Sequence, residues 1–344
     1  SREWELAHPD ELNDSGREPF MDCRRFCFAS DVWADEVKRT LKLFIEHIES
    51  MPYAENIIGY HLATGQTEEW MAFDVKGSRG KRSHEKFALT GIEKTEENYC
   101  KFLSDVIADR ICVFSKYIKE LTDGRMLAGA FYGYTFELLK RGKGHYSLNR
   151  VLDCPYVDFL CSPISYAQGR KEGRDHGYLL PISSVTEAGK LYFAENDTRT
   201  HISRPPNDLP HYNSPVWYGP DVDTTVNIMK MHFAKSITHG HSSWWFDMWG
   251  GWFKDDRYMS LLEKMHTISD ESIGLSMKSM AEVGVFVDEN SIFNLEDSNP
   301  VYKKVVYDIR EVLGDAHGKR INTMVTSVIK YSTDKNCIGM EPEV

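Results

Sequence analysis

Apolar residues along the chain recur either at helical spacing or in short continuous runs. After Ser30, a residue type that often caps a helix, six apolar residues return on one helical face: Trp33, Val37, Leu41, Phe44, Ile45 and Ile48. Beyond them comes the short run from Ile57 to Leu62, whose length and composition favour a buried strand. The pattern therefore predicts a helix that is followed by a strand.

The same alternation continues over most of the chain. Helical spacing covers residues 99–117, 147–152 and 226–237, and strand-like runs cover residues 126–132, 157–160, 190–194 and 244–246. Short strands that take turns with helices are typical of βα units and of a parallel sheet. We therefore expect an α/β fold with parallel strands.

A second pattern begins near residue 275. It contains an apolar run at 283–287, a polar turn and a helical stretch at 300–313, which together indicate the start of a separate α/β unit. The chain is therefore expected to comprise a larger unit at residues 1–270 and a smaller one at residues 275–344.

Composition narrows the class of protein. The 52 acidic residues exceed the 41 basic ones and give a net charge of -11, which argues against a nucleic-acid groove. No apolar run approaches the ~18–20 residues of a membrane span, so a soluble protein, cytoplasmic or secreted, is expected. The 7 cysteines are scattered and form no CxxC pair, which favours free thiols over a disulfide framework or a structural zinc site.

Three segments combine residue types that carry chemistry. In residues 59–70 a strand runs into a turn that contains Glu68 and Glu69. In residues 191–200 a strand ends at Glu195, and Arg199 follows shortly after it. Residues 239–249 combine two histidines with several tryptophans. Because the carboxyl ends of parallel strands share one edge of a sheet, these side chains are expected to meet there.

Two carboxyl groups that meet among aromatic rings suit glycoside hydrolysis. One must be protonated to serve the leaving oxygen, while the other must be ionised to attack or stabilise an oxocarbenium-like centre. Arg199 near Glu195 would keep that carboxylate ionised by lowering its pKa. Plainer interpretations remain open, since acidic residues after strands often cap helices, and His61 or any one tryptophan can belong to the core.

Taken together, the three segments resemble the clan of retaining (β/α)8-barrel glycoside hydrolases, most closely the β-galactosidases of family 42. The resemblance covers residues 1–270. It implies that Glu195 is the nucleophile after strand seven, and that the acid/base residue follows strand four, where Glu69 and Glu68 are both candidates. Glu69 fits better because the aromatic Trp70 follows it. The resemblance implies neither a cofactor nor a metal ion.

The resemblance also implies a substrate and partners. The substrate is expected to be a carbohydrate, cleaved at a β-glycosidic bond by exo action, and no nucleic acid or membrane is expected as a partner. The unit at 275–344 resembles the start of the flavodoxin-like domain that helps these enzymes trimerise, which implies a homo-oligomer. The residues expected to bind the sugar are His61, Trp70, Tyr132, Arg199, His241, Trp245, Asp247 and Trp249.

Two features depart from the family pattern. The turn reads Thr67-Glu68-Glu69 where the clan usually has an Asn-Glu pair, and the cysteine cluster that binds zinc in some relatives is absent. The pattern also supplies only five of the eight strands of a barrel, the first three being missing. We therefore expect a (β/α)8 TIM barrel that lacks strands one to three and is either a fragment or completed by a separate N-terminal segment.

Two other functions remain open. His239 and His241, with Asp247 and His61, could serve a metal-dependent hydrolase on the same barrel. Alternatively, the chain could be a non-catalytic carbohydrate-binding protein that keeps its aromatic residues while its carboxyl groups have no catalytic role.

Overall fold

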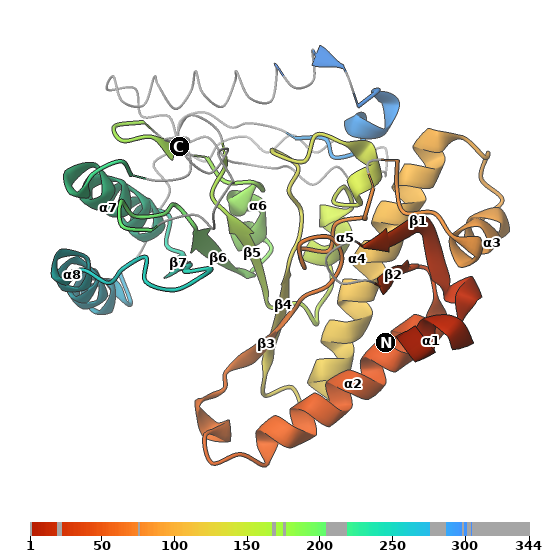
Figure 1. Cartoon of the computed structure of the whole chain (residues 1–344), viewed down its shortest axis with the longest axis horizontal. Helices are drawn as coiled ribbons and strands as arrows, with labels where there is room; N and C mark the ends of the chain where they lie inside the picture. The colour runs from red at the N-terminus through yellow and green to blue at the C-terminus, as the bar shows by residue number, and fades with distance from the viewer. Residues whose placement is uncertain are drawn as a thin grey trace, which may run out of the picture.

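The centre of the molecule is a parallel sheet of five strands (Figure 1). The computed structural model describes residues 2–18, 23–74, 76–166, 170–174, 177–203, 219–275, 287–297, 299–300 and 304. The strands follow one another in the sheet in chain order: β3 (Gly59–Leu62), β4 (Leu127–Phe131), β5 (Phe159–Pro163), β6 (Leu191–Asn196) and β7 (Ser242–Trp245). Each neighbouring pair is parallel, so all five carboxyl ends lie along one edge.

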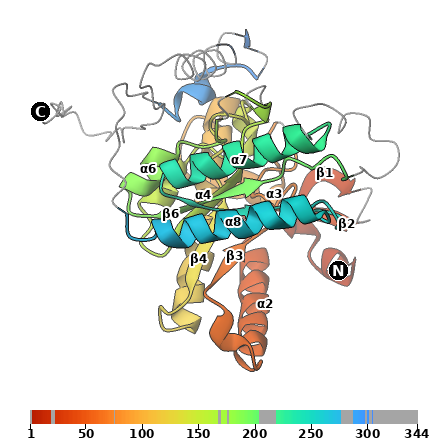
Figure 2. The ribbon, with the colours of Figure 1, turned by 90° about the vertical axis from the view of Figure 1, so that its left-hand side faces the viewer.

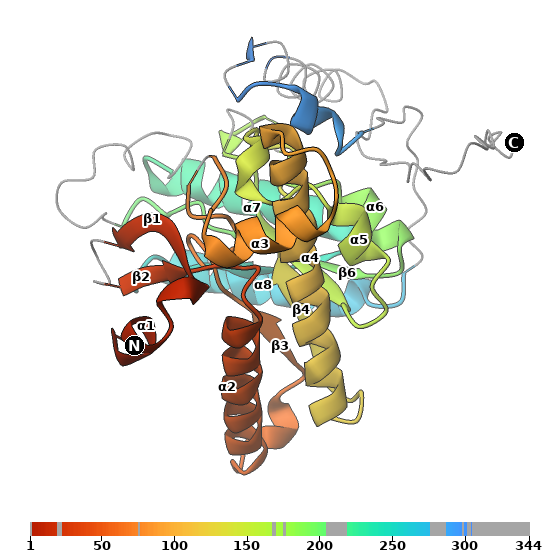
Figure 3. The ribbon, with the colours of Figure 1, turned by 90° about the vertical axis from the view of Figure 1, so that its right-hand side faces the viewer.

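Helices connect these strands and cover the sheet. The longest, α4 (Glu96–Leu121), packs against β3 and β4, and it also contacts α2 (Asp31–Glu49) and α5 (Leu148–Leu152) (Figure 3). Its buried apolar residues recur every three or four positions, which is the spacing of one helical face: Leu103, Ile107, Ile111, Phe114 and Ile118. This stripe joins the side chains of β3 and β4 in the main core.

The far end of the sheet has its own small core. There α6 (Ile182–Glu187) contacts β6, and α7 (Val222–Thr238) contacts both β7 and α8 (Asp256–Ser272). Figure 2 shows α7 and α8 side by side. Met229 of α7 packs with Tyr258 and Met265 of α8 to form this cluster.

The N-terminal residues, which carry no clear sequence pattern, form a small layer beside the main sheet. It comprises α1 (Arg2–Ala7), η1 (Pro9–Glu11) and an antiparallel pair, β1 (Leu12–Glu18) and β2 (Cys23–Phe26). Ser30 caps α2, as predicted, by accepting a hydrogen bond from the Trp33 amide at 2.9 Å. The Ser30 hydroxyl also donates to Glu11 at 2.6 Å, and Glu11 pairs with Arg82 of α3 (Lys81–Leu89) at 2.8 Å. These contacts tie the N-terminal layer to the helices.

The expectation of a (β/α)8 TIM barrel is wrong. Within the described residues the parallel strands form one sheet of five, which is not a closed eight-stranded barrel. The five strands themselves lie where the apolar runs predict them. The sheet curls as half a barrel would, since the ring centroids of Phe131 on β4 and Trp244 on β7 are only 5.9 Å apart. The error arose because the number eight came from the resemblance, whereas the pattern of the chain predicts five strands.

Little of the predicted second unit can be compared with the structure. The expected strand at 283–287 and helix at 300–313 lie almost entirely outside the described residues. One described piece, η6 (Ser291–Asn294), buries Ile292 and Phe293 against Tyr146 and Cys100 of the larger unit. Two further short helices are η2 (Ala54–Asn56) and η3 (Arg141–Lys143).

None of the helices in the described ranges is long and apolar enough to cross a membrane.

Candidate active site

The turn after β3 has a strained backbone. Thr67, Glu68 and Trp70 have positive φ angles of 55°, 65° and 60°, a region that residues with a Cβ atom rarely adopt. The turn is held because the amide of Gln66 donates to the carbonyl of Met71 at 2.9 Å. The buried Trp70 ring anchors it too, as its Nε1 donates to the carbonyl of Leu62 at 2.9 Å. Glu69 itself has no positive φ angle, but it lies between residues that do.

Two hydroxyl groups hold the carboxyl group of Glu69. Tyr134 donates its phenolic hydrogen to Oε1 at 2.8 Å, and Thr67 donates to Oε2. Burial raises the pKa of Glu69, and so does the charge of Asp197, while the two hydroxyl groups oppose this rise. Glu69 is thus a half-buried carboxyl group that is fixed in one orientation.

A buried histidine connects this turn to the loop after β4. His145 Nδ1 accepts hydrogen bonds from the amides of Gly133 and Tyr134, both at 3.2 Å. Its proton therefore lies on Nε2, which donates to the carbonyl of Glu69 at 2.9 Å. Burial lowers the pKa of His145 to about 3, so the ring is neutral and its role is positional.

Glu195 lies at the carboxyl end of β6, opposite Pro163 of β5 and Trp244 of β7. Burial raises its pKa to about 8, with further increases from the negative charges of Asp197 and Glu69 and an opposing effect from Arg170. No hydrogen bond reaches its carboxyl group from any residue that the structure describes. Glu195 and Glu69, which belong to different strand ends, therefore share one electrostatic cluster with Asp197.

The cation of this cluster is Arg170. Its fully buried guanidinium donates to Asp197 and to the carbonyl oxygens of Ile164 and Ser165, at 2.7 and 2.9 Å respectively. Tyr166 lies against it, with the guanidinium carbon 4.4 Å from the ring centroid. Arg170 therefore lies where Arg199 was expected.

Arg199 has other neighbours. Its buried guanidinium lies 5.6 Å from the ring centroid of Trp249. Trp249 packs on Trp252, whose amide donates to Asp247 at 3.0 Å and whose carbonyl accepts from Thr200. The loop after β7 thus packs against the loop after β6, and Trp249 lies beside Arg199.

Three of the predicted sugar-binding residues contribute to the packing of the fold. Trp70 belongs to the main core, and so does Tyr132, whose hydroxyl donates to the carbonyl of Gly144 at 3.0 Å. Trp245 packs on Phe253 beside α7 and α8. The adjacent Trp244 lies on the same face of the sheet as Glu195, because the two residues pair in register.

The remaining predicted residues are spread over the site and the sheet. His61 lies on the curved face, with its ring 4.4 Å from Phe131 and 6.0 Å from Phe159. Glu68 is exposed. Tyr134, His145, Arg170 and Asp197 were missed by the sequence analysis, since they lie in loops where no periodicity marks them.

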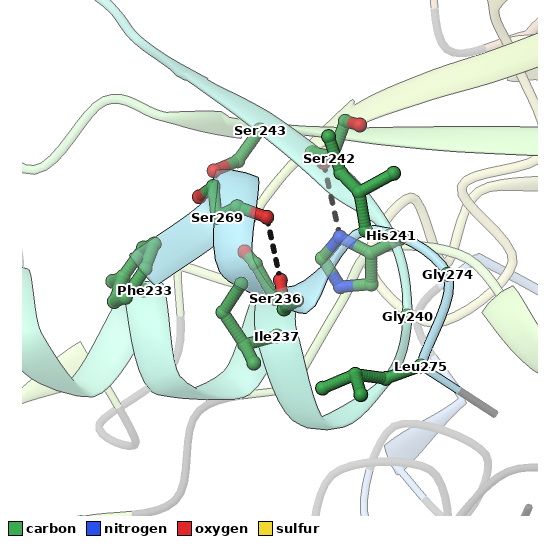
Figure 4. Close-up of a pocket in the computed structure, with 12 residues that line it drawn as sticks. Phe233, Ser236, Ile237, Gly240, His241, Ser242, Ser243, Ser269, Gly274 and Leu275 are labelled. Carbon is green, nitrogen blue, oxygen red and sulfur yellow. Dashed lines mark hydrogen bonds between the residues drawn. The ribbon is translucent and has the colours of Figure 1, made fainter. Parts of the chain in front are cut away.

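His239 and His241 lie at the opposite end of β7 from Trp244. A cavity of about 470 Å³ opens there between the ends of α7 and α8 (Figure 4). His241 Nε2 lies 2.6 Å from the hydroxyl of Tyr178, and Nδ1 lies 3.0 Å from the carbonyl of Ser242. Among the described residues, no three histidine, cysteine or acidic side chains are arranged to hold a metal ion. The donor set expected for a metal-dependent hydrolase, with His61 and Asp247, is therefore not assembled.

The carboxyl edge of the sheet thus carries three interacting carboxyl groups, one buried arginine and two tyrosines. Comparison with known proteins adds no further assignment: no protein-family model and no curated protein matches this chain.

Proposed function

We propose that the chain is a glycoside hydrolase that cleaves a β-glycosidic bond with Glu69 and Glu195. The observation that supports this function is that two carboxyl groups from different strand ends both have raised pKa values: the charge of Asp197 raises the pKa of both, and the charge of Glu69 raises that of Glu195. Such a pair keeps one proton near neutral pH, which is the state that acid-assisted departure of a sugar leaving group requires.

The position of each carboxyl group supports a distinct role. Glu69 sits on a turn whose neighbours Thr67 and Glu68 are exposed, so it can reach both the leaving oxygen and water. Glu195 sits on the strand itself, beside Trp244. We assign the acid/base role to Glu69 and the nucleophilic role to Glu195.

The proposed reaction has two displacements. In the first, Glu195 attacks the anomeric carbon, the glycosidic bond breaks, and Glu69 gives its proton to the departing oxygen. In the second, Glu69 takes a proton from water, whose oxygen attacks the same carbon and releases Glu195. The sugar leaves with its configuration retained.

Charge coupling makes this division of roles compatible with the raised pKa of Glu195. The charge of Glu69 raises the pKa of Glu195, so ionisation of one carboxyl group hinders ionisation of the other, and a single proton can lie on either. The reactive form is the one in which Glu69 holds this proton and Glu195 is ionised. The resemblance favours exo action on a β-galactoside, and Trp244, which pairs in register with Glu195, is the candidate aromatic platform for the sugar.

Covalent trapping tests the function and the nucleophile together. The chain is incubated with a panel of activated 2-deoxy-2-fluoro β-glycosides, digested and analysed by mass spectrometry. We expect one sugar of the panel to label Glu195, and Glu195→Gln to abolish both labelling and turnover. Labelling of another carboxyl group, or equal turnover by this variant, would contradict the assignment.

A second pair of variants tests the acid/base residue. Glu69→Ala is expected to hydrolyse glycosides with a good leaving group slowly and to be accelerated by azide, which replaces water without needing a base. Glu68→Ala is the matched control, which should behave as the unchanged chain does. If no panel member is hydrolysed but sugars still bind, the chain is a carbohydrate-binding protein instead.

A further inference from the structure

The cavity at the amino end of β7 has no part in the proposed reaction, because Glu195 and Trp244 lie at the other end of their strands. Its volume of about 470 Å³ falls within the range of small-molecule pockets, ~300–1,000 Å³. Figure 4 shows that its walls come from α7, from the start of β7 and from the end of α8. The cavity can therefore be considered as a second binding site.

Serine hydroxyl groups supply much of the polar lining of this cavity. Ser236 of α7 donates its hydroxyl hydrogen to the carbonyl of His232 at 3.2 Å, and Ser272 of α8 donates to the carbonyl of Ser269 at 2.8 Å. A hydroxyl group whose hydrogen is already engaged still has lone pairs that can accept a hydrogen bond. These two serines therefore suit a ligand that carries donors. The serines that line the cavity are Ser236, Ser242, Ser243, Ser269 and Ser272.

His241, the one titratable side chain among the described residues that line the cavity, is neutral and has a partner on each nitrogen. Its Nδ1 lies 3.0 Å from the carbonyl of Ser242, so this nitrogen carries the proton. Its Nε2 then accepts from the hydroxyl of Tyr178 at 2.6 Å. Burial lowers the pKa of His241 to about 4, so the ring brings no positive charge to the cavity at neutral pH.

The helices around the cavity add a negative potential. Both α7 and α8 end beside it, and the carboxyl end of a helix acts as roughly half a negative charge. The last turn of α8 also carries the exposed Asp270 and Glu271 and has no basic residue. The basic residue in the last turn of α7 is Lys235, whose ammonium group lies 5.4 Å from the ring centroid of Tyr178. The local charges thus favour a cation over an anion.

Apolar side chains complete the lining. Phe233 and Ile237 belong to α7, while Ile273 and Leu275 follow α8 and are 79% and 61% exposed. Such exposed apolar side chains at a cavity can contact the hydrocarbon part of a ligand. The ligand is therefore expected to combine a positive charge with an apolar chain.

We propose that this cavity binds a small organic cation that has a primary ammonium group and a hydrocarbon chain. The three N–H groups of the ammonium donate to serine oxygens such as those of Ser236 and Ser272. The hydrocarbon chain lies against Ile237, Ile273 and Leu275. This site does not depend on the proposed glycosidase function.

The test compares three molecules of similar shape and different charge. Hexylamine, hexan-1-ol and hexanoate are titrated into the whole chain at pH 7.5 and followed by calorimetry, with hexylamine as the cation. We expect hexylamine to bind at least tenfold more tightly than hexan-1-ol, and hexanoate to show no binding. Binding of hexanoate as tight as that of hexylamine, or no binding of hexylamine, would overturn the proposal without the use of any variant.

Three variants locate the bound amine. Ser269→Leu fills the cavity and should weaken hexylamine binding at least tenfold, whereas Thr267→Leu places the same side chain on the exposed surface of α8 and should bind as the unchanged chain does. Glu195→Gln should also keep binding, because the carboxyl edge is the other place where a cation could bind. Loss of binding in Glu195→Gln with retention in Ser269→Leu, or equal loss in both leucine variants, would refute the site.

Discussion

At the residue scale, the hydroxyl group of Tyr134 distinguishes the two carboxyl groups of the candidate active site. It donates to the carboxyl group of Glu69, whereas the carboxyl group of Glu195 receives no hydrogen bond from the described residues. A hydrogen bond to a carboxylate favours its charged form, so Glu69 ionises before Glu195 in the free protein. The pair is therefore expected to give a bell-shaped pH dependence, with the basic limb near the pKa of about 8 of Glu195.

Tyr134→Phe tests this asymmetry. Loss of the hydrogen bond raises the pKa of Glu69, so the acidic limb of the pH profile of kcat/KM should move upward by about half to one pH unit, as expected for an interaction of ~1 kcal/mol. Tyr132→Phe is the matched control, because its hydroxyl donates to backbone carbonyls and not to Glu69. An unchanged acidic limb in Tyr134→Phe would show that this hydroxyl does not tune the pair.

Glu195→Gln should change the pH dependence of folding stability. In the folded chain Glu195 keeps its proton up to about pH 8, whereas in the unfolded chain it loses it near pH 4. The folded state binds more protons between these values, so this group makes the unchanged chain less stable as pH rises through that window. The glutamine variant does not ionise, and urea unfolding should show a gain on the order of 5 kcal/mol near pH 8.5 and none near pH 4. An equal gain at both pH values would refute the raised pKa.

At the element scale, the turn after β3 adopts a strained backbone conformation that places the side chain of Glu69. Three of its residues have positive φ angles, and the buried ring of Trp70 holds the conformation. Such strain persists only where surrounding contacts impose it, and it often accompanies function. The turn carries Glu68 outward, while Glu69 lies with Tyr134.

Glu68→Gly tests whether the strained backbone of this turn affects folding stability without affecting catalysis. Glycine adopts the left-handed conformation at no steric cost, so this exposed substitution should raise stability by up to about 1 kcal/mol in thermal unfolding. This variant should still hydrolyse the glycoside of the sugar that the trapping experiment identifies, whereas Glu69→Gln should not. Loss of activity in Glu68→Gly with full activity in Glu69→Gln would exchange the roles of the two residues.

The elements were predictable because their signals are local. The apolar runs at 57–62 and 190–194 predict β3 and β6, and Ser30 marks the start of α2. Alternation along a strand shows which of its side chains share a face, but the register that pairs Trp244 rather than Trp245 with Glu195 comes only from the structure. The site was predictable only in its two strand-end carboxyl groups, since Tyr134 and Arg170 reach it from loops that have no periodic pattern.

At the scale of the whole molecule, long-range contacts decide what the pattern leaves open. Nothing in a local run states how many strands a sheet will have, and the predicted barrel failed for this reason.

The curl of the sheet brings the Trp244 indole beside Phe131, although the two rings belong to β7 and β4. The emission of this tryptophan consequently depends on a contact that exists only while the sheet stays curved. The difference between the fluorescence spectra of the unchanged chain and of Trp244→Phe would isolate the emission of this residue. That emission would report whether the sheet flattens when a denaturant or a ligand acts elsewhere in the molecule.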